Sequence, residues 1–269
     1  MPRTISSSYR LQLHAGFTFR DASDVAVYLE DLGVSHVYCS PYLQAAKGSM
    51  HGYDVVDPQK VNCEIGGEEG HAQFCETLQA LKLGQVLDIV PNHMAAVPEN
   101  RYWWDLLENG PSSRYATWFD VDWNSAEIKL QNKVLIPVLG EQYGRALSAN
   151  QIAIHYDNGL FEVRYMEHQF PLAPRSLAIP LALASKSIRV PTLGFIADSL
   201  SRLPSPDSTE ADMLAARHRD KAILYELLLR LSTEQSEVST AIQWAVDTIN
   251  KNAETLDQIL NLQSYRLAY

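Results

Sequence analysis

The sequence predicts an α/β protein that begins with a parallel sheet and continues into a mixed and then a helical segment. Residues 1–95 alternate between apolar strand-like runs and amphipathic helix-like runs, which is typical of strands joined by right-handed helical crossovers. Residues 96–175 contain a hairpin signal, and residues 176–269 carry apolar residues at three- and four-residue spacing. We therefore expect the start of a parallel α/β domain, an inserted mixed subdomain and a helical subdomain over these three ranges.

The first segment has clear element boundaries. A helix is expected to begin at Thr18, because Asp21 three residues later gives the spacing of a capping box, and to end at Gly33. A second helix follows, and Gly84 is expected in the left-handed position that closes it. The strands around these helices are expected over residues 7–13, 34–40 and 84–90.

The remaining two segments have different signals. The turn Asp157-Asn158-Gly159 between two apolar runs strongly predicts a β-hairpin over residues 152–166. A hairpin after a parallel pattern usually marks an inserted subdomain. Further elements are expected as a short helix after Asn100, a strand over 133–139, and helices over 211–232 and 236–250.

The composition excludes several classes of partner. The 269 residues are 46% hydrophobic and 20% charged, as in ordinary soluble globular proteins. The formal net charge of −10 disfavours nucleic acid and anionic membranes, and it permits a neutral ligand such as a sugar. Cys39, Cys63 and Cys75 lack metal-ligand spacing and favour a reducing, cytoplasmic location. Residues 1–13 lack the core of a signal peptide, no later run is long enough to span a bilayer, and no metal or cofactor is expected.

The segment GQVLDIVPNHM (84–94) places a carboxylate, Asp88, and an imidazole, His93, at the end of an apolar strand. The run suits a strand buried on both faces, where a charge is costly unless a partner stabilises it. Taken alone, the segment favours a carboxylate held by backbone donors and a histidine on a surface loop. Active sites of parallel sheets gather at the carboxyl ends of the strands, so we expect both residues to lie near Gln12 and His14, at the end of the first strand.

The loop after the second strand carries residues suited to a carbohydrate. Gly48 and Gly52 allow close backbone approach to a ligand. Tyr53 offers a flat apolar face with a polar tip, and Asp54 offers a carboxylate for hydroxyl groups. As isolated residues, packing for the tyrosine and turn closure for the aspartate are the more common roles.

Together these segments resemble a known enzyme family. SPYLQAAKGSMHGYDVVDP (40–58) followed by DIVPNH (88–93) resembles the first third of the catalytic domain of the α-amylase superfamily of glycoside hydrolases. SSYRLQLHAGFTF (7–19), VLIPVLGEQYGRAL (134–147) and RYMEHQFPLAPRS (164–176) narrow this to the family of maltooligosyl trehalose synthases, the (1→4)-α-D-glucan 1-α-D-glucosylmutases. The five segments in this order are highly specific.

The resemblance implies the first three βα units of a (β/α)8 TIM barrel. It implies an isomerase of trehalose biosynthesis that turns the reducing-end α-1,4 bond of a maltooligosaccharide into an α,α-1,1 bond by a retaining mechanism. In such a site Asp88 would hold the residues at the base of the site through hydrogen bonds, and His93 would donate to a hydroxyl of the reacting sugar. Tyr53 would stack beneath that sugar, with Asp54 beside it.

The sequence departs from this family in one respect. The family's catalytic carboxylates follow strands four, five and seven, and no segment here resembles those signatures. We therefore expect an N-terminal portion without catalytic residues of its own, inactive by itself. Asn92 matches a calcium position of some amylases, but the role of a hydrogen-bonding loop residue is favoured. Two alternatives stay open: another α-glucan hydrolase or transglycosidase of the superfamily, and an inert glucan-binding piece.

Overall fold

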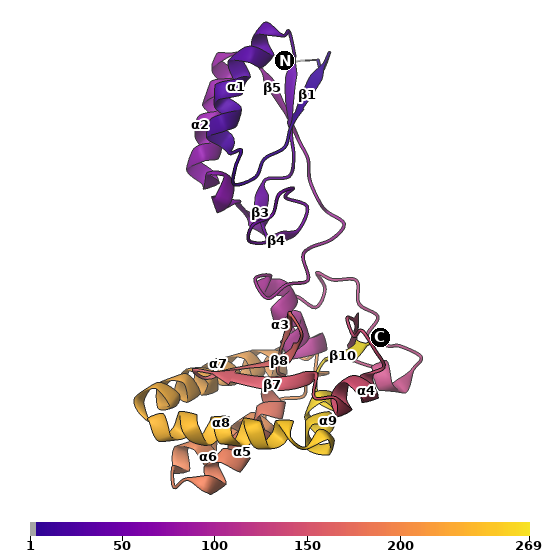
Figure 1. Ribbon diagram of the computed structural model, residues 1–269, viewed down its shortest axis with the longest axis vertical. Helices are drawn as coiled ribbons and strands as arrows, with labels where there is room; N and C mark the ends of the chain where they lie inside the picture. The colour runs from indigo at the N-terminus through magenta and orange to yellow at the C-terminus, as the bar shows by residue number, and fades with distance from the viewer. Residues whose placement is uncertain (1–3) are drawn as a thin grey trace. The chain divides into compact units, whose positions relative to one another are not determined.

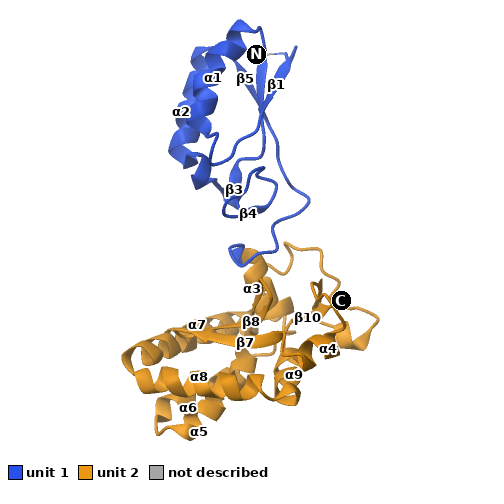
Figure 2. Ribbon diagram, in the orientation of Figure 1, with its two compact units in different colours: residues 1–101 blue, residues 102–269 orange. Residues whose placement is uncertain are grey.

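The computed structural model describes residues 4–269, which form two compact units. Unit 1 covers Met1–Arg101 and unit 2 covers Tyr102–Tyr269 (Figure 2). Each unit encloses its own cluster of buried apolar side chains.

Unit 1 is built on a parallel sheet with the strand order β1 (Ser8–Leu11), β2 (His36–Cys39), β5 (Gly84–Leu87) (Figure 1). The register sets Arg10 of β1 beside Tyr38 of β2, and Tyr38 beside Val86 of β5. The carboxyl ends of the three strands therefore meet at one edge of the sheet, as the alternation of elements predicts.

Two helices, α1 (Phe19–Asp31) and α2 (Gly67–Ala80), lie side by side along this sheet (Figure 1). The backbone N–H of Thr18 donates to the Asp21 carboxylate at 2.7 Å, which confirms the predicted capping box. Gly33, with a φ of 80°, follows the end of α1 as expected. The apolar residues of both helices pack with those of β1 and β2 in the core of unit 1.

Strand β5 corrects the prediction of a strand buried on both faces. Leu87 is 51% exposed and Ile89 is 67% exposed. The reason is that β5 is an edge strand, which pairs with β2 alone within residues 4–269. Gly84 is not left-handed either, because Lys82 takes that conformation with a φ of 55°. A Cβ atom at Gly84 would instead lie 2.2 Å from the ring of His36.

The segment after β2, interpreted as a loop from the sequence, contains an antiparallel pair. Its strands are β3 (Leu43–Ala45) and β4 (Val55–Val61), followed by a 3-10 turn at Cys63–Ile65. The backbone N–H of Ala46 donates to the carbonyl of Asp54 at 2.9 Å and closes the loop between the strands. Tyr53 is therefore carried by a loop with a fixed base.

Unit 2 contains two sheets among the described residues. An antiparallel sheet has the order β7 (Ile152–Asp157), β8 (Leu160–Tyr165), β9 (His168–Pro171), and a parallel pair joins β6 (Val134–Pro137) to β10 (Tyr265–Ala268). The predicted hairpin turn is confirmed, with φ of 45° at Asn158 and 88° at Gly159. The helices are α3 (Arg101–Asn109), α4 (Tyr143–Ser148), α5 (Ala178–Ser187), α6 (Pro191–Ser201), α7 (Ala211–Glu234), α8 (Ser236–Asn250) and α9 (Ala253–Asn261), with 3-10 turns at Gly110–Ser112, Ile128–Leu130 and Pro174–Leu177.

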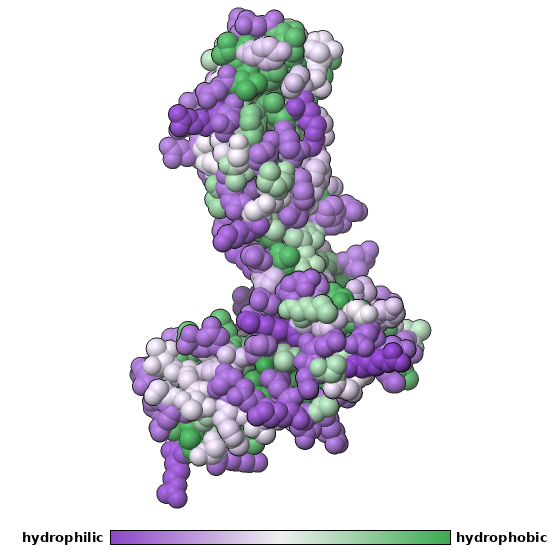
Figure 3. Space-filling view, viewed as in Figure 1, coloured by the Kyte–Doolittle hydropathy of each residue, from purple (hydrophilic) through white to green (hydrophobic). Residues whose placement is uncertain are grey.

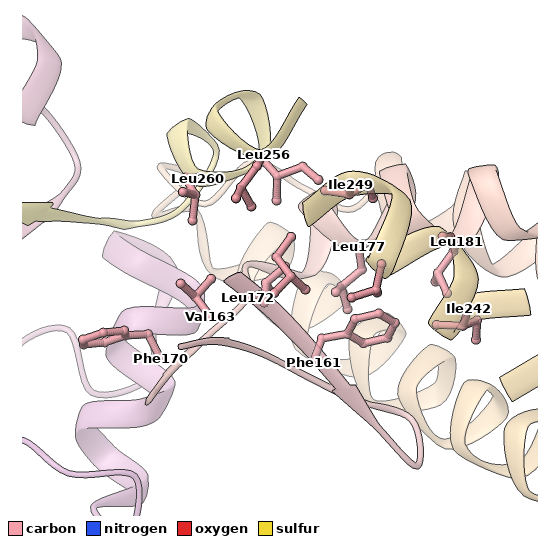
Figure 4. Close-up of a cluster of buried hydrophobic side chains, with 14 of the residues drawn as sticks. Phe161, Val163, Phe170, Leu172, Leu177, Leu181, Ile242, Ile249, Leu256 and Leu260 are labelled. Carbon is pink, nitrogen blue, oxygen red and sulfur yellow. The ribbon is translucent and has the colours of Figure 1, made fainter. Parts of the chain in front are cut away.

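The hairpin sheet and the helices of unit 2 share one core. Figure 4 shows Phe161 and Val163 of β8 beside side chains of the segments that follow, and Phe170 of β9 belongs to the same cluster. The expected boundary at residue 175 between two subdomains stays a prediction. The labelled side chains are Phe161, Val163, Phe170, Leu172, Leu177, Leu181, Ile242, Ile249, Leu256 and Leu260.

Apolar side chains also reach the surface. On the face shown in Figure 3 they are interspersed with polar residues on both units. Among the described residues of unit 1, the exposed large apolar residues are Ile5, Tyr9, Val27, Tyr28, Leu32, Met50, Leu87 and Ile89.

Candidate functional site

Asp88 follows β5 directly and is the centre of a hydrogen-bonded cluster. Its Oδ2 atom accepts from the hydroxyl of Tyr53 at 2.6 Å and from the hydroxyl of Tyr38 at 2.9 Å. The Arg10 guanidinium makes an ion pair with the same oxygen at 3.4 Å. The Asp88 side chain is only 14% exposed. These three donors explain how a mostly buried carboxylate is tolerated at the end of a strand.

The same contacts fix the charges of the cluster. Burial raises the pKa of Asp88, but the hydrogen bonds from Tyr53, Tyr38 and Arg10 outweigh it and hold the pKa below 3.8, the usual value. The hydrogen bond to Asp88 raises the pKa of Tyr38, so this hydroxyl keeps its proton and donates. Asp88 is therefore an anion at neutral pH and has no proton to give.

Gln12 joins this cluster through Arg10. Its Oε1 atom accepts from Arg10 Nη2 at 3.0 Å, and its Nε2 donates to the carbonyl of Met50 at 3.1 Å. Arg10 Nη2 also lies 3.3 Å from the Tyr53 hydroxyl. We call Arg10, Gln12, Tyr38, Tyr53 and Asp88 the Asp88 cluster.

The fold brings these side chains together at the carboxyl edge of the sheet. Arg10 and Tyr38 are register partners on adjacent strands, and Asp88 follows the third strand. The loop that carries Tyr53 turns at Gly52, which has a φ of 77° and where a Cβ atom would lie 2.1 Å from the carbonyl oxygen of Pro41. The close approach at this glycine is thus to the chain itself.

His93 contacts the backbone of the same loop. Its Nε2 atom lies 3.1 Å from the carbonyl oxygen of Tyr53. A carbonyl only accepts, so Nε2 carries the proton and Nδ1 of the neutral ring is an acceptor. The side chain is exposed. His93 can therefore hold the Tyr53 loop and still face a ligand.

Asp54 and His14 have local partners. Asp54 Oδ1 accepts a very short hydrogen bond from Ser49 and lies 3.6 Å from His51 Nδ1, so it braces the Tyr53 loop. His14 Nδ1 accepts from the backbone N–H of Gly16 at 3.0 Å within a tight turn. No hydrogen bond or ion pair described within residues 4–269 joins His14 to the Asp88 cluster.

Sequence reasoning missed Arg10 and Tyr38. The signal for Arg10 is its spacing from Gln12, because residues two apart in a strand face the same side. Two polar side chains on one face of the first strand indicate that this face does not contribute to an apolar core. Tyr38 follows from the register, which only the sheet reveals.

The described residues also bear on metal binding and membrane insertion. No group of three or more His, Cys, Asp or Glu residues within 4–269 could hold a metal ion. None of the helices in this range is both long and apolar enough to cross a bilayer.

This chain is similar in sequence to proteins with α-amylase-type catalytic domains. Residues 23–148 match the α-amylase catalytic domain. A Mycobacterium tuberculosis protein with the provisional name maltooligosyl trehalose synthase is 44% identical over 143 residues, which is 51% of this chain and 18% of that protein. An intracellular maltogenic amylase of Bacillus subtilis is 34% identical over 94 residues, covering 35% of this chain and 15% of the amylase. This chain thus spans less than a fifth of either relative.

Solved structures agree with these matches. The maltooligosyltrehalose synthase of Arthrobacter ramosus is 40% identical, with a TM-score of 0.55 over 64% of this chain and 21% of that one. A structure titled DSM5389 glycosyltrehalose synthase is 27% identical, with a TM-score of 0.62 over 99% of this chain and 27% of that one.

These matches confirm the resemblance found in the sequence and imply an α/β fold of the TIM-barrel kind. The sequence and the fold together relate this chain to the maltooligosyl trehalose synthases of the α-amylase superfamily, and they match it to a part of such a protein.

Proposed function

We propose that this chain supplies part of the active site of a maltooligosyl trehalose synthase. The reaction is an intramolecular transglucosylation that turns the reducing-end α-1,4 bond of a maltooligosaccharide into an α,α-1,1 bond, for trehalose biosynthesis. The observation that carries the proposal is the Asp88 cluster, which lies at the carboxyl edge of a parallel sheet, in a chain that is 44% identical to a synthase relative over 143 residues.

The sheet of unit 1 would form the first strands of a (β/α)8 barrel. The order β1, α1, β2, α2, β5 supports three βα units, with residues 96–175 as an inserted subdomain and 176–269 as a helical one. One edge of β5 pairs with no strand among residues 4–269, which supports pairing with a further strand. Such a strand would shield the exposed side chains of Leu87 and Ile89 from water.

The Asp88 cluster positions the reacting sugar. The ionised carboxylate fixes the Tyr53 hydroxyl, so the phenol ring is held rigidly and can cover one face of a pyranose. Gln12 belongs to the cluster through Arg10, and His93, which contacts the backbone of Tyr53, would accept from a sugar hydroxyl through Nδ1. Asp54 and His14 stay proposed substrate-binding residues, and each also has a partner in its own loop.

The bond exchange itself needs two further carboxyl groups. A retaining mechanism uses one carboxylate as nucleophile and one carboxylic acid as proton donor, roughly 5 Å apart. Asp88 fits neither role, because its pKa is lowered and the oxygen Oδ2 already accepts from three donors. Both groups would come from sequence outside these 269 residues, and the 269-residue chain by itself would be inactive.

Product analysis tests the proposed function. A complete synthase containing this sequence is incubated with maltopentaose, and reducing ends and chain length are followed together. The proposal predicts loss of reducing ends at unchanged chain length. Release of shorter reducing sugars would instead favour a hydrolase, the second candidate, which the 34% identity to a maltogenic amylase supports.

The cellular location is proposed to be cytoplasmic. Cys39, Cys63 and Cys75 are all free thiols, which is the state maintained in a reducing compartment.

A further inference from the structure

A shallow groove lies in unit 2 between the end of β7 and helix α8. Its cavity volume is about 510 Å³. The hairpin turn at Asp157 and Asn158 lines one side, and α8 lines the other with Ser239, Gln243 and Trp244. Trp244 is 48% exposed although it is a large aromatic residue.

The walls of the groove are fixed to each other. The side chain of Asn250 accepts from the backbone N–H of Ile154 at 2.9 Å and donates to its carbonyl at 2.8 Å, which ties α8 to the edge of β7. The Tyr156 hydroxyl lies 3.2 Å from the hydroxyl of Ser239. The groove therefore needs little ordering when a ligand binds.

The edge of β7 also offers backbone groups. Because both backbone groups of Ile154 bond to Asn250, the pair Ile154–Val163 does not hydrogen-bond across the hairpin. Backbone direction alternates along a strand, so Tyr156, two residues later, directs its N–H and C=O to the same side as Ile154. Tyr156 lines the groove, so its main chain offers a donor and an acceptor on that side of β7.

The side chains match a neutral polyhydroxylated ring. The indole of Trp244 can cover the apolar C–H face of a pyranose, which removes apolar area from water. Asp247, held by Gln243 Nε2 at 2.8 Å, and Asp157, held by Asn158 Nδ2 at 2.9 Å, offer carboxylate oxygens to sugar hydroxyls. None of the described residues that line the groove is Lys, Arg or His, which disfavours phosphates and other anions.

We propose that this groove is a second, non-catalytic site that binds an α-glucan chain through Trp244. The choice of an α-linked glucan rests on the proposed function, whereas the groove's fit to a hexose ring rests on its own geometry. The site would hold a glucan on unit 2 while another part of the protein acts on a chain end.

Fluorine NMR of the 269-residue chain labelled with 5-fluorotryptophan tests the proposal. Trp244→Phe assigns the resonance, and maltoheptaose is titrated. We expect this resonance to shift with a dissociation constant on the order of 1 mM. Asp247→Ala should weaken binding roughly tenfold, through loss of a charged acceptor. Glu226→Ala removes an exposed helical carboxylate of α7 outside the groove and should change nothing.

Three outcomes would overturn the proposal. They are an unmoved Trp244 resonance, a shift with spermidine but not with maltoheptaose, and an equal shift with cellohexaose. Tyr53→Ala should leave the Trp244 shift intact. If the Trp244 resonance shifts but the complete protein fails the product assay, the proposed function alone is refuted. If the complete protein passes the product assay but the Trp244 resonance does not shift, the groove alone is refuted.

Discussion

The hydroxyl of Tyr53 should lower the pKa of Asp88. In Tyr53→Phe the carboxylate loses its shortest hydrogen bond, 2.6 Å, and retains Tyr38 and Arg10. A hydrogen bond to a charged group contributes about 1.5–3 kcal/mol. Two donors remain, so the lower end, about 1.5 kcal/mol, is expected, and its loss raises the pKa of Asp88 toward the ordinary range.

The sign follows from which form of Asp88 is stabilised. The folded-state pKa is depressed, so its contribution to stability is present above the unfolded-state pKa and is lost as the pH falls through the folded-state value. Tyr53→Phe should move that loss to higher pH and lower the free energy of unfolding at pH 7 by about 1.5 kcal/mol.

Carboxyl ¹³C NMR measures this directly. Asp88→Asn assigns the resonance, and the acid titration is repeated in Tyr53→Phe. Tyr28→Phe is the matched control, because Tyr28 is an exposed residue of α1 without a contact to Asp88 among those described. An unchanged pKa of Asp88 in Tyr53→Phe would refute the assignment of the phenol as its main donor.

Three further predictions address the histidine, the thiols and a packed glycine. In a complete synthase His93→Ala should raise the activation free energy of the bound substrate by about 2 kcal/mol, so kcat falls far more than KM rises. An unchanged kcat would remove His93 from the site. Exposed Cys63 should react with a thiol reagent at pH 8 while Cys39 stays protected, since burial raises the pKa of Cys39 to about 11; equal labelling by mass spectrometry would contradict this. Gly84→Ala should lower the free energy of unfolding by about 1–3 kcal/mol, because the Cβ atom meets His36. Gly144→Ala is the control, because open space surrounds a Cβ atom there, and it should not lower the free energy of unfolding in denaturant titrations. Equal stability of the two variants would refute the clash.

Local signals predicted most of the individual elements. The capping box at Thr18 and the turn at Asn158 and Gly159 are short-range patterns, because neighbouring residues in the chain determine their conformation. Helix α8 occupies residues 236–250, the range that its apolar spacing predicts.

What the sequence could not show depends on long-range pairing. The pairing of β6 with β10 joins strands more than a hundred residues apart, and neither strand has a local signal for its partner. The exposure of Leu87 likewise depends on which strands flank β5, because a central strand and an edge strand share one apolar pattern.

The candidate site shows the same division. Tyr53, Asp88 and Gln12 were predicted as site residues from loop and strand-end positions, and the structure joins them in one cluster. Arg10 is identified only when the two faces of its strand are distinguished, because the apolar pattern of the whole strand does not separate them. The local partners of His14 could not be predicted, because they depend on how the chain turns at Gly16.

The kinetics of Asp88→Asn in a complete synthase test the central claim most directly. The amide keeps the size of the carboxylate but removes the charge that holds Tyr53, Tyr38 and Arg10. We expect kcat/KM for the α,α-1,1 product to fall roughly a hundredfold, about 3 kcal/mol, while Asp31→Asn on the exposed end of α1 leaves it unchanged. A folded Asp88→Asn enzyme with wild-type kcat/KM would contradict the assignment of the Asp88 cluster to the active site.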